Sequence, residues 1–319
     1  MKSFPLNKKF YAIFWMAILF AFGLMGCNSA ALFLPSPIPT TEAALLVTIL
    51  PTETPSPSAT PSPTPSQSAT QTSTPTKTAT TTLTPTPTPV LVTPEKGQVQ
   101  VPILLYHHIK DFQGRGQQYY VSVADFKEQM RALHEWGYQT LTVTQLVDII
   151  LKKEVYPQRS VVITFDDGNL DVYQNAFPVM QSLGLKGTVY VVATELTANL
   201  NLSVDVLKEM AKIGWEIGSH SMTHPDLTKS DRLGYEICES RTLLAKEVGV
   251  KVMSFAYPYG AYNDHVFQIT RDCGYSSGAG LGLFNQHSLY SLFYLSRREV
   301  KGGMTLADFA NLLPWNAKP

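Results

Sequence analysis

Short apolar runs alternate with helical patterns from about residue 98 to the end of the chain, and this alternation restricts the fold more than any other feature. The strand candidates are 101–108, 160–165, 187–193, 215–220 and 252–258. The helix candidates are 123–137, 142–153, 170–183, 203–214, 231–249, 263–274 and 305–313. Alternating strands and helices predict a parallel α/β fold, and about seven such units favour a (β/α) barrel, complete or incomplete.

The first 27 residues have the character of an export signal. Three lysines precede an uncharged apolar stretch over 10–25, and the stretch ends in Leu-Met-Gly-Cys at Cys27. This ending resembles a bacterial lipobox, in which the cysteine carries lipid and becomes the first mature residue. We therefore expect a lipoprotein signal peptide over 1–27 and a membrane attachment through Cys27, with an uncleaved anchor as the alternative. In both cases the rest of the chain lies outside the cytoplasm, at a cell surface or in a periplasm.

Residues 28–96 are dominated by proline, threonine and serine and have almost no aromatic residues. Such a composition cannot bury enough apolar surface to fold, so we expect a disordered linker. The folded domain is then expected over 97–319. Twenty-five basic and 25 acidic residues give no net charge, and nothing in this balance indicates nucleic acid as a partner. We expect a monomer.

Two cysteines remain beside Cys27. Cys238 and Cys273 lie far apart in the sequence, and their spacing does not reveal whether they pair. A disulfide is permitted outside the cytoplasm. We nevertheless expect these two cysteines to be unpaired.

Polar side chains follow several of the predicted strands, at the point where each strand ends. The clearest case is the pair Asp166 and Asp167, which follows the apolar run 160–165 and precedes Gly168. Asp-Gly is also a common hairpin turn. A continuous buried strand before it and a helical pattern after it favour a strand, loop and helix instead. In such units, functional groups sit at the carboxyl ends of the strands.

A metal site is indicated by the five residues "HSMTH", which place His220 and His224 four positions apart. Pro225 follows directly, so we expect a tight loop or a single turn rather than a pair in mid-helix. Two imidazoles and one carboxylate form a common catalytic zinc set, and Asp167 is the natural carboxylate. Hydrolysis of an amide also needs a base for the attacking water and an acid for the departing amine. Asp166 and a protonated histidine suit these tasks.

The motifs "TFDDG", "HSMTH" and "AYPYG", in this order, resemble those of the polysaccharide deacetylases of the NodB-homology type, carbohydrate esterase family 4. The resemblance covers roughly residues 99–300. It implies a distorted (β/α)7 barrel that removes N-acetyl groups from amino sugars of an extracellular or cell-wall polysaccharide. It also implies a divalent metal, with Zn²⁺ expected and Co²⁺, Ni²⁺ or Mn²⁺ as alternatives.

The resemblance implies a role for each matching residue. Asp166 matches the general base, and the backbone N–H of Tyr259 matches an oxyanion donor, with Pro258 beside it as a substrate contact. The metal ligands are matched by Asp167, His220 and His224.

Two departures from the common family pattern affect the expected site. Ala256 stands where an arginine is usual, and no histidine follows His287 near the end of the chain. The runs "LLYHHI" and "FAYPYG" are similar to those of deacetylases that act on exported poly-N-acetylglucosamine. That likeness makes His107 the acid, with His108 as the alternative. Arg297 is expected to supply the charge missing at position 256 and to bind substrate.

Four aromatic residues are candidates either for a sugar cleft or for the core: Tyr119, Tyr120, Trp215 and Tyr257. Two other functions remain open on the sequence alone. One is a surface glycan-binding protein that keeps the fold with weak or no catalysis, which the missing arginine favours. The other is metal-dependent hydrolysis of an amide that is not a sugar.

Overall fold

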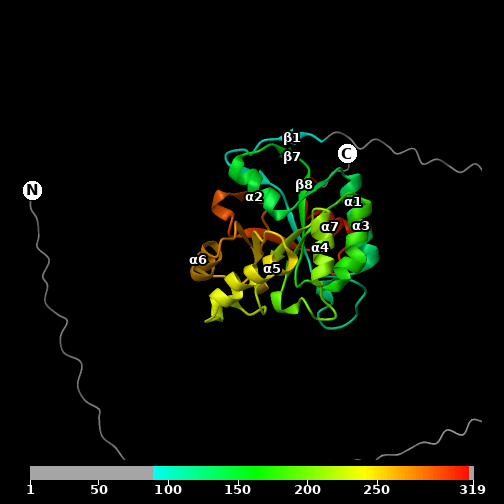
Figure 1. Cartoon of the computed structure of the whole chain (residues 1–319). Coiled ribbons are helices and arrows are strands. Elements are labelled where there is room, and N and C mark those ends of the chain that lie inside the picture. The colour runs from blue at the N-terminus through cyan, green and yellow to red at the C-terminus, as the bar shows by residue number, and fades with distance from the viewer. Residues whose placement is uncertain (1–88, 316–319) are drawn as a thin grey trace, which may run out of the picture. The chain divides into compact units, whose positions relative to one another are not determined.

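Seven parallel strands close into a barrel at the centre of the computed structural model, which describes residues 89–315 (Figure 1). In spatial order these strands are β3 (Ile103–Tyr106), β14 (Leu295–Glu299), β12 (Ser277–Leu281), β11 (Ser254–Ala256), β10 (Glu216–Ser219), β9 (Thr188–Val191) and β8 (Ser160–Phe165). The barrel closes where β3 pairs with β8, from Ile103 beside Val162 to Tyr106 beside Phe165. The predicted (β/α)7 barrel is confirmed.

The barrel is distorted by a short extra strand that the sequence did not reveal. β6 (Gln139–Leu141) pairs with residues 160–162 of β8, whereas residues 164–165 of the same strand pair with β9. The three residues of β6 are all half-buried. A strand of three residues is too short to show an alternation of apolar and polar positions, so the sequence does not predict it.

Within residues 89–315, seven α-helices surround the strands (Figure 1). They are α1 (Val123–Glu135), α2 (Val143–Lys152), α3 (Phe177–Ser182), α4 (Val204–Lys212), α5 (Ser240–Val248), α6 (Asp264–Asp272) and α7 (Leu306–Ala310). Side-chain caps fix several starts; for example, the Ser122 hydroxyl accepts a hydrogen bond from the backbone N–H of Asp125. Single π-helical turns precede two of the helices: η2 (Val172–Ala176) before α3 and η5 (Gly234–Glu239) before α5.

Shorter elements complete the described chain. The small strands are β1 (Leu91–Val92), β2 (Gln98–Gln100), β4 (His108–Ile109), β5 (Tyr120–Val121), β7 (Tyr156–Pro157) and β13 (Gln286–Ser288). The 3-10 turns are η1 (Gln117–Tyr119), η3 (Ala193–Glu195), η4 (Leu227–Lys229), η6 (Pro258–Gly260) and η7 (Leu289–Ser291).

The barrel interior contains an apolar cluster. Ile103, Val162, Tyr190 and Leu295 are fully buried there and belong to one cluster, which also includes apolar residues of α2. Side chains alternate between the two faces of a strand. Arg297 therefore shares the inward face of β14 with Leu295, two residues away. A charged side chain thus lies inside the barrel, one layer above the apolar cluster.

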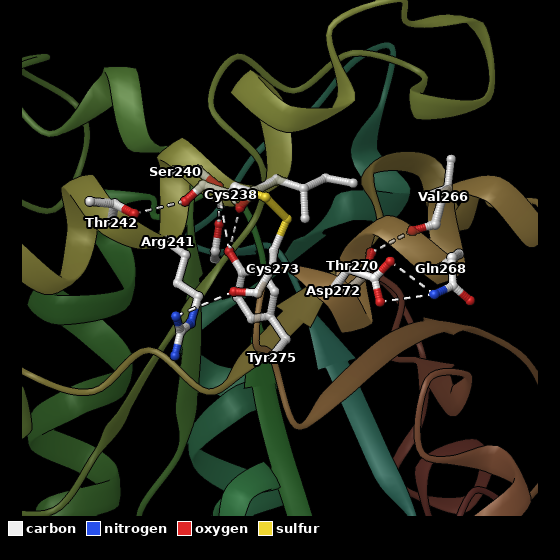
Figure 2. Close-up of a disulfide and its surroundings, with 12 residues drawn as sticks. Cys238, Ser240, Arg241, Thr242, Val266, Gln268, Thr270, Asp272, Cys273 and Tyr275 are labelled. Atoms are coloured by element: carbon white, nitrogen blue, oxygen red, sulfur yellow. Dashed lines mark hydrogen bonds between the residues drawn. A yellow bond between two sulfur atoms is a disulfide. The ribbon is translucent and has the colours of Figure 1, made fainter.

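A disulfide joins Cys238 in η5 to Cys273, the residue after α6 (Figure 2). Their Cα atoms lie 4.9 Å apart, so our expectation of unpaired cysteines is wrong. The two residues are 35 positions apart in the sequence, and only the packing of α6 beside η5 brings them together. Arg241 reinforces the same junction, because its Nη1 donates to the carbonyl of Cys273 at 3.3 Å.

A short strand precedes the domain boundary that we predicted at residue 97. Residues 91–92 form β1, which pairs antiparallel with β7. The predicted signal peptide, Cys27 and the linker up to residue 88 lie outside the described residues. Within residues 89–315, no helix has the length and apolar character needed to cross a membrane.

Candidate active site

The residues singled out at the strand ends line one cavity of about 430 Å³. They are His107 after β3, Asp166 and Asp167 after β8, His220 and His224 after β10, Tyr259 after β11, and Arg297 on β14. Parallel strands in a closed barrel have all their carboxyl ends at one rim. Residues up to 190 positions apart in the sequence, such as His107 and Arg297, therefore line the same cavity.

Three of these side chains could hold a metal ion. The Oδ1 atom of Asp167 lies 3.5 Å from the Nε2 atoms of both His220 and His224, and the two Nε2 atoms are 3.2 Å apart. Ligand atoms of the three residues all lie within 4.8 Å of one another. This set of two imidazoles and one carboxylate, here called the trio, matches a catalytic zinc site in its chemistry.

The orientation of His220 is fixed by a backbone contact. Its Nδ1 donates a hydrogen bond to the carbonyl oxygen of Ala256 at 2.8 Å, so its Nε2 faces Asp167. The side chain is almost completely buried, and this burial lowers the pKa of His220 below its ordinary value. A neutral imidazole with a fixed tautomer is the form that binds a metal.

Strained backbone is concentrated at the site. Four residues other than glycine have left-handed φ angles here: Asp167 (69°), Ser221 (68°), His224 (60°) and Tyr259 (61°). Such conformations are costly for residues with a Cβ and are found where function requires them. His224 occupies a tight loop before Pro225, as predicted, and its backbone N–H is held by the Ser221 hydroxyl at 2.8 Å.

A buried glutamate that the sequence analysis missed holds this loop. Glu236, in the π-helical turn η5, is 1% exposed. Its carboxylate accepts hydrogen bonds from the backbone N–H of Thr223 at 2.9 Å and from the Thr223 hydroxyl at 2.8 Å. Its carbonyl oxygen accepts from the N–H of Met222 at 3.0 Å. The only sequence signal was an acidic residue beside Ile237 on an otherwise apolar helix face.

Asp166 and Arg297 form a bidentate ion pair inside the barrel. The two Nη atoms of Arg297 lie 2.6 and 2.8 Å from the two carboxylate oxygens of Asp166. Burial raises the pKa of Asp166, but the Arg297 guanidinium, together with His220 and His107, outweighs this effect and the pKa falls to about 2. The carboxylate is therefore ionised at all ordinary pH values. Its Oδ2 lies 3.7 Å from the Nε2 of His220, so Asp166 stands directly beside the trio.

The two predicted substrate contacts, Pro258 and Arg297, are both buried. Arg297 is 1% exposed, and its Nε also donates to the carbonyl of Gly280 at 3.1 Å, so its donors face the protein. Pro258 is buried and starts the turn η6. The turn brings Tyr259 to the cavity, where its ring centroid is 4.7 Å from that of His224.

The two neighbouring histidines have different surroundings. His108 Nδ1 lies 2.8 Å from Asp171 Oδ2, and its ring stacks on Tyr120 at 4.2 Å. The ring of His107 meets the edge of Tyr119 at 5.0 Å, and His107 is among the groups that lower the pKa of Asp166.

Of the four aromatic candidates, two line the cavity and two belong to the core. Tyr119 and Tyr120 line the cavity. Trp215 and Tyr257 are buried and belong to the core.

Comparisons with known proteins point to one family. A family model described as "Polysaccharide deacetylase" matches residues 153–278. The crystal structure of a polysaccharide deacetylase from Bacillus cereus superposes with a TM-score of 0.61 at 30% identity, covering 67% of this chain and 69% of that one. A Streptococcus pyogenes deacetylase solved with acetate gives a TM-score of 0.62 at 26% identity, covering 71% and 99%.

A relative named as a deacetylase shares part of the sequence. The poly-β-1,6-N-acetyl-D-glucosamine N-deacetylase of Staphylococcus aureus is 29% identical over 179 residues. The match covers 51% of this chain and 61% of the staphylococcal protein.

Proposed function

The chain belongs to the polysaccharide deacetylase family, and on that premise we propose that it hydrolyses the N-acetyl groups of amino sugars in a glycan. The reaction consumes one water molecule and yields acetate and a free amine, which is protonated at neutral pH. The single observation that carries this proposal is that Asp166, an ionised carboxylate, stands beside the trio in one open cavity. The similarity to the staphylococcal enzyme supports an N-acetylglucosamine polymer as the substrate.

Asp167, His220 and His224 would hold a divalent ion, and zinc fits their chemistry best, with cobalt, nickel or manganese as alternatives. When bound, such an ion polarises a carbonyl group and makes water more acidic. The hydrogen bond from His220 to Ala256 and the bonds from Thr223 to Glu236 orient the ligands before the ion arrives.

In the proposed mechanism Asp166 accepts the proton of the attacking water. Before the reaction its carboxylate is ionised at working pH, and Arg297 fixes both of its oxygens in place. Arg297 is thus a positioning residue that supplies the positive charge absent at Ala256. That contact also removes the main support for a protein that binds glycans without turnover.

His107 is proposed as the acid that protonates the departing nitrogen. It lines the same cavity as Asp166, and its ring contacts Tyr119 without a carboxylate partner among residues 89–315. His108 is a weaker candidate because Asp171 already holds its Nδ1. The backbone N–H of Tyr259 is proposed to help stabilise the oxyanion from the turn η6.

We also propose that the domain works outside the cytoplasm as a monomer, attached to a membrane through lipid on Cys27. The Cys238–Cys273 disulfide supports this location, because disulfides persist mainly in oxidising compartments. Replacing Cys27 with alanine should move the protein from the membrane fraction to the soluble fraction. Retention in the membrane fraction would contradict the lipid attachment.

The function is tested by measuring acetate released from N-acetylglucosamine oligomers. We expect release by the wild type, loss after treatment with a chelator, and recovery when zinc is added back. Asp166→Asn should release no acetate while its zinc content stays equal to that of the wild type. Acetate release by Asp166→Asn at the wild-type rate would refute the role of the base.

A further inference from the structure

A second cavity, of about 590 Å³, adjoins the trio on the side away from Arg297. It shares Asp167 and His224 with the first cavity and extends over the loops that follow β8 and β9. The two cavities therefore form one groove with the trio near its middle. A groove of this kind has room for a neighbouring sugar unit as well as the one that reacts.

Three asparagine side chains of the second cavity donate hydrogen bonds to the protein main chain. Asn169, Asn175 and Asn201 each use an Nδ2 donor on a main-chain carbonyl, at 3.3, 2.7 and 3.3 Å. These bonds turn the amide nitrogens toward the protein. Because the amide oxygens are acceptors, the wall favours ligands that carry hydroxyl or ammonium donors.

The two carboxylates at the far side of this cavity, Asp171 and Glu195, differ in their partners. Asp171 is in contact with His108 Nδ1 at 2.8 Å and with Lys110 Nζ at 3.7 Å. Glu195 instead accepts a hydrogen bond from Asn201 at 2.5 Å, and it forms no ion pair within residues 89–315. Glu195 is half-buried, so its negative charge is available to a cation that enters the groove.

We propose that the second cavity binds a glucosamine unit that has already lost its acetyl group, with its ammonium ion at Glu195. This inference rests on the proposed function, because the free amine is the product of that reaction. The unit under attack lies at the trio, and its deacetylated neighbour occupies the second cavity. Removal of one acetyl group then favours removal of the next, and free amines accumulate in runs along the glycan.

The test compares two oligosaccharides of equal length. One is fully N-acetylated, and the other carries a single internal glucosamine. We expect wild-type kcat/KM, measured by acetate release, to be about tenfold higher on the second, as one charge-assisted hydrogen bond allows. Glu195→Gln keeps the shape and the acceptor for Asn201, and it should abolish the preference while leaving kcat/KM on the fully acetylated oligomer unchanged.

Glu299→Gln is the matched control, because Glu299 lines the first cavity and its loss removes one carboxylate charge from the other half of the groove. It should keep the tenfold preference. Equal rates on the two oligomers by an active wild type, or an unchanged preference in Glu195→Gln, would overturn the inference.

A binding measurement tests this inference independently of the proposed function. The affinity of zinc-loaded protein for a glucosamine tetramer, measured by calorimetry, should fall about tenfold in Glu195→Gln. If the wild type released no acetate from either oligomer, the proposed function would fail, and this titration would still decide whether the cavity binds the amine. Equal affinities of the two proteins would contradict the site.

Discussion

Replacing Arg297 with methionine should expose the cost of the buried charge on Asp166. With Arg297 present, the pKa of Asp166 is about 2, against an ordinary value of 3.8. At about 1.4 kcal/mol per pKa unit, the ionised carboxylate contributes on the order of 2 kcal/mol to folding. A depressed pKa stabilises the fold above the unfolded value, so this contribution is present above pH 4 and is lost as the pH falls toward 2.

In Arg297→Met, the effect of the Asp166 carboxylate on the pH dependence of folding stability should change sign. Burial without the guanidinium raises the pKa of Asp166, and breaking a buried ion pair typically costs about 3 to 5 kcal/mol. We expect a loss of that size in the free energy of unfolding at pH 7, measured by urea unfolding of chelator-treated protein. The deficit should shrink toward pH 4, where the unpaired carboxyl takes up a proton.

The double variant Arg297→Met/Asp166→Asn provides the control, because it removes both charges. It should regain most of the stability lost at pH 7. A deficit below about 1 kcal/mol for Arg297→Met, or one that is the same at pH 7 and pH 4, would refute the electrostatic reasoning.

Three further changes test other parts of the site. Glu236→Ala should weaken zinc affinity about 10- to 100-fold, measured in competition with a chelating dye, because outer-shell contacts orient the ligands. Glu239 is an exposed neighbour in the same turn, and Glu239→Ala should leave the zinc affinity unchanged. Equal affinities of the two variants would contradict the role of Glu236. Cys273→Ser should lower the free energy of unfolding by about 3 to 4 kcal/mol under oxidising conditions, as expected for closing a loop of this length. Under reducing conditions it should match the wild type, and a difference that persists with reductant would point to lost packing instead. His107→Gln should lower kcat for acetate release about 10²- to 10⁴-fold with zinc still bound, and a greater loss in His108→Gln would assign the acid to the other histidine.

The parts of the site that could be predicted from the sequence are those that lie at strand ends. Asp166 follows a strand whose six residues are all buried, and His220 follows another, so barrel topology alone places them at one rim. The trio could be predicted because its residue types and spacing are those of a metal site. Its convergence within 4.8 Å agrees with that prediction.

The other features of the site and fold depend on contacts between distant parts of the chain. Arg297 lies 131 positions from Asp166, and only closure of the barrel through β14 and β3 brings the two together, so their ion pair could not be predicted from the sequence. Glu236 contacts the loop that carries His224 from a π-helical turn that no periodic pattern indicated. The pairing of Cys238 with Cys273 likewise follows from the packing of two helical segments.

The central claim is that Asp167, His220 and His224 bind one divalent ion beside the ionised carboxylate of Asp166. The most direct measurement is a crystal structure of zinc-soaked protein with anomalous data collected at the zinc absorption edge. The account predicts one peak at about 2.0 to 2.2 Å from an oxygen of Asp167 and from the Nε2 atoms of both histidines, with Asp166 still paired to Arg297. A peak elsewhere in the domain, or a zinc ion bound by Asp166 in place of Asp167, would contradict it.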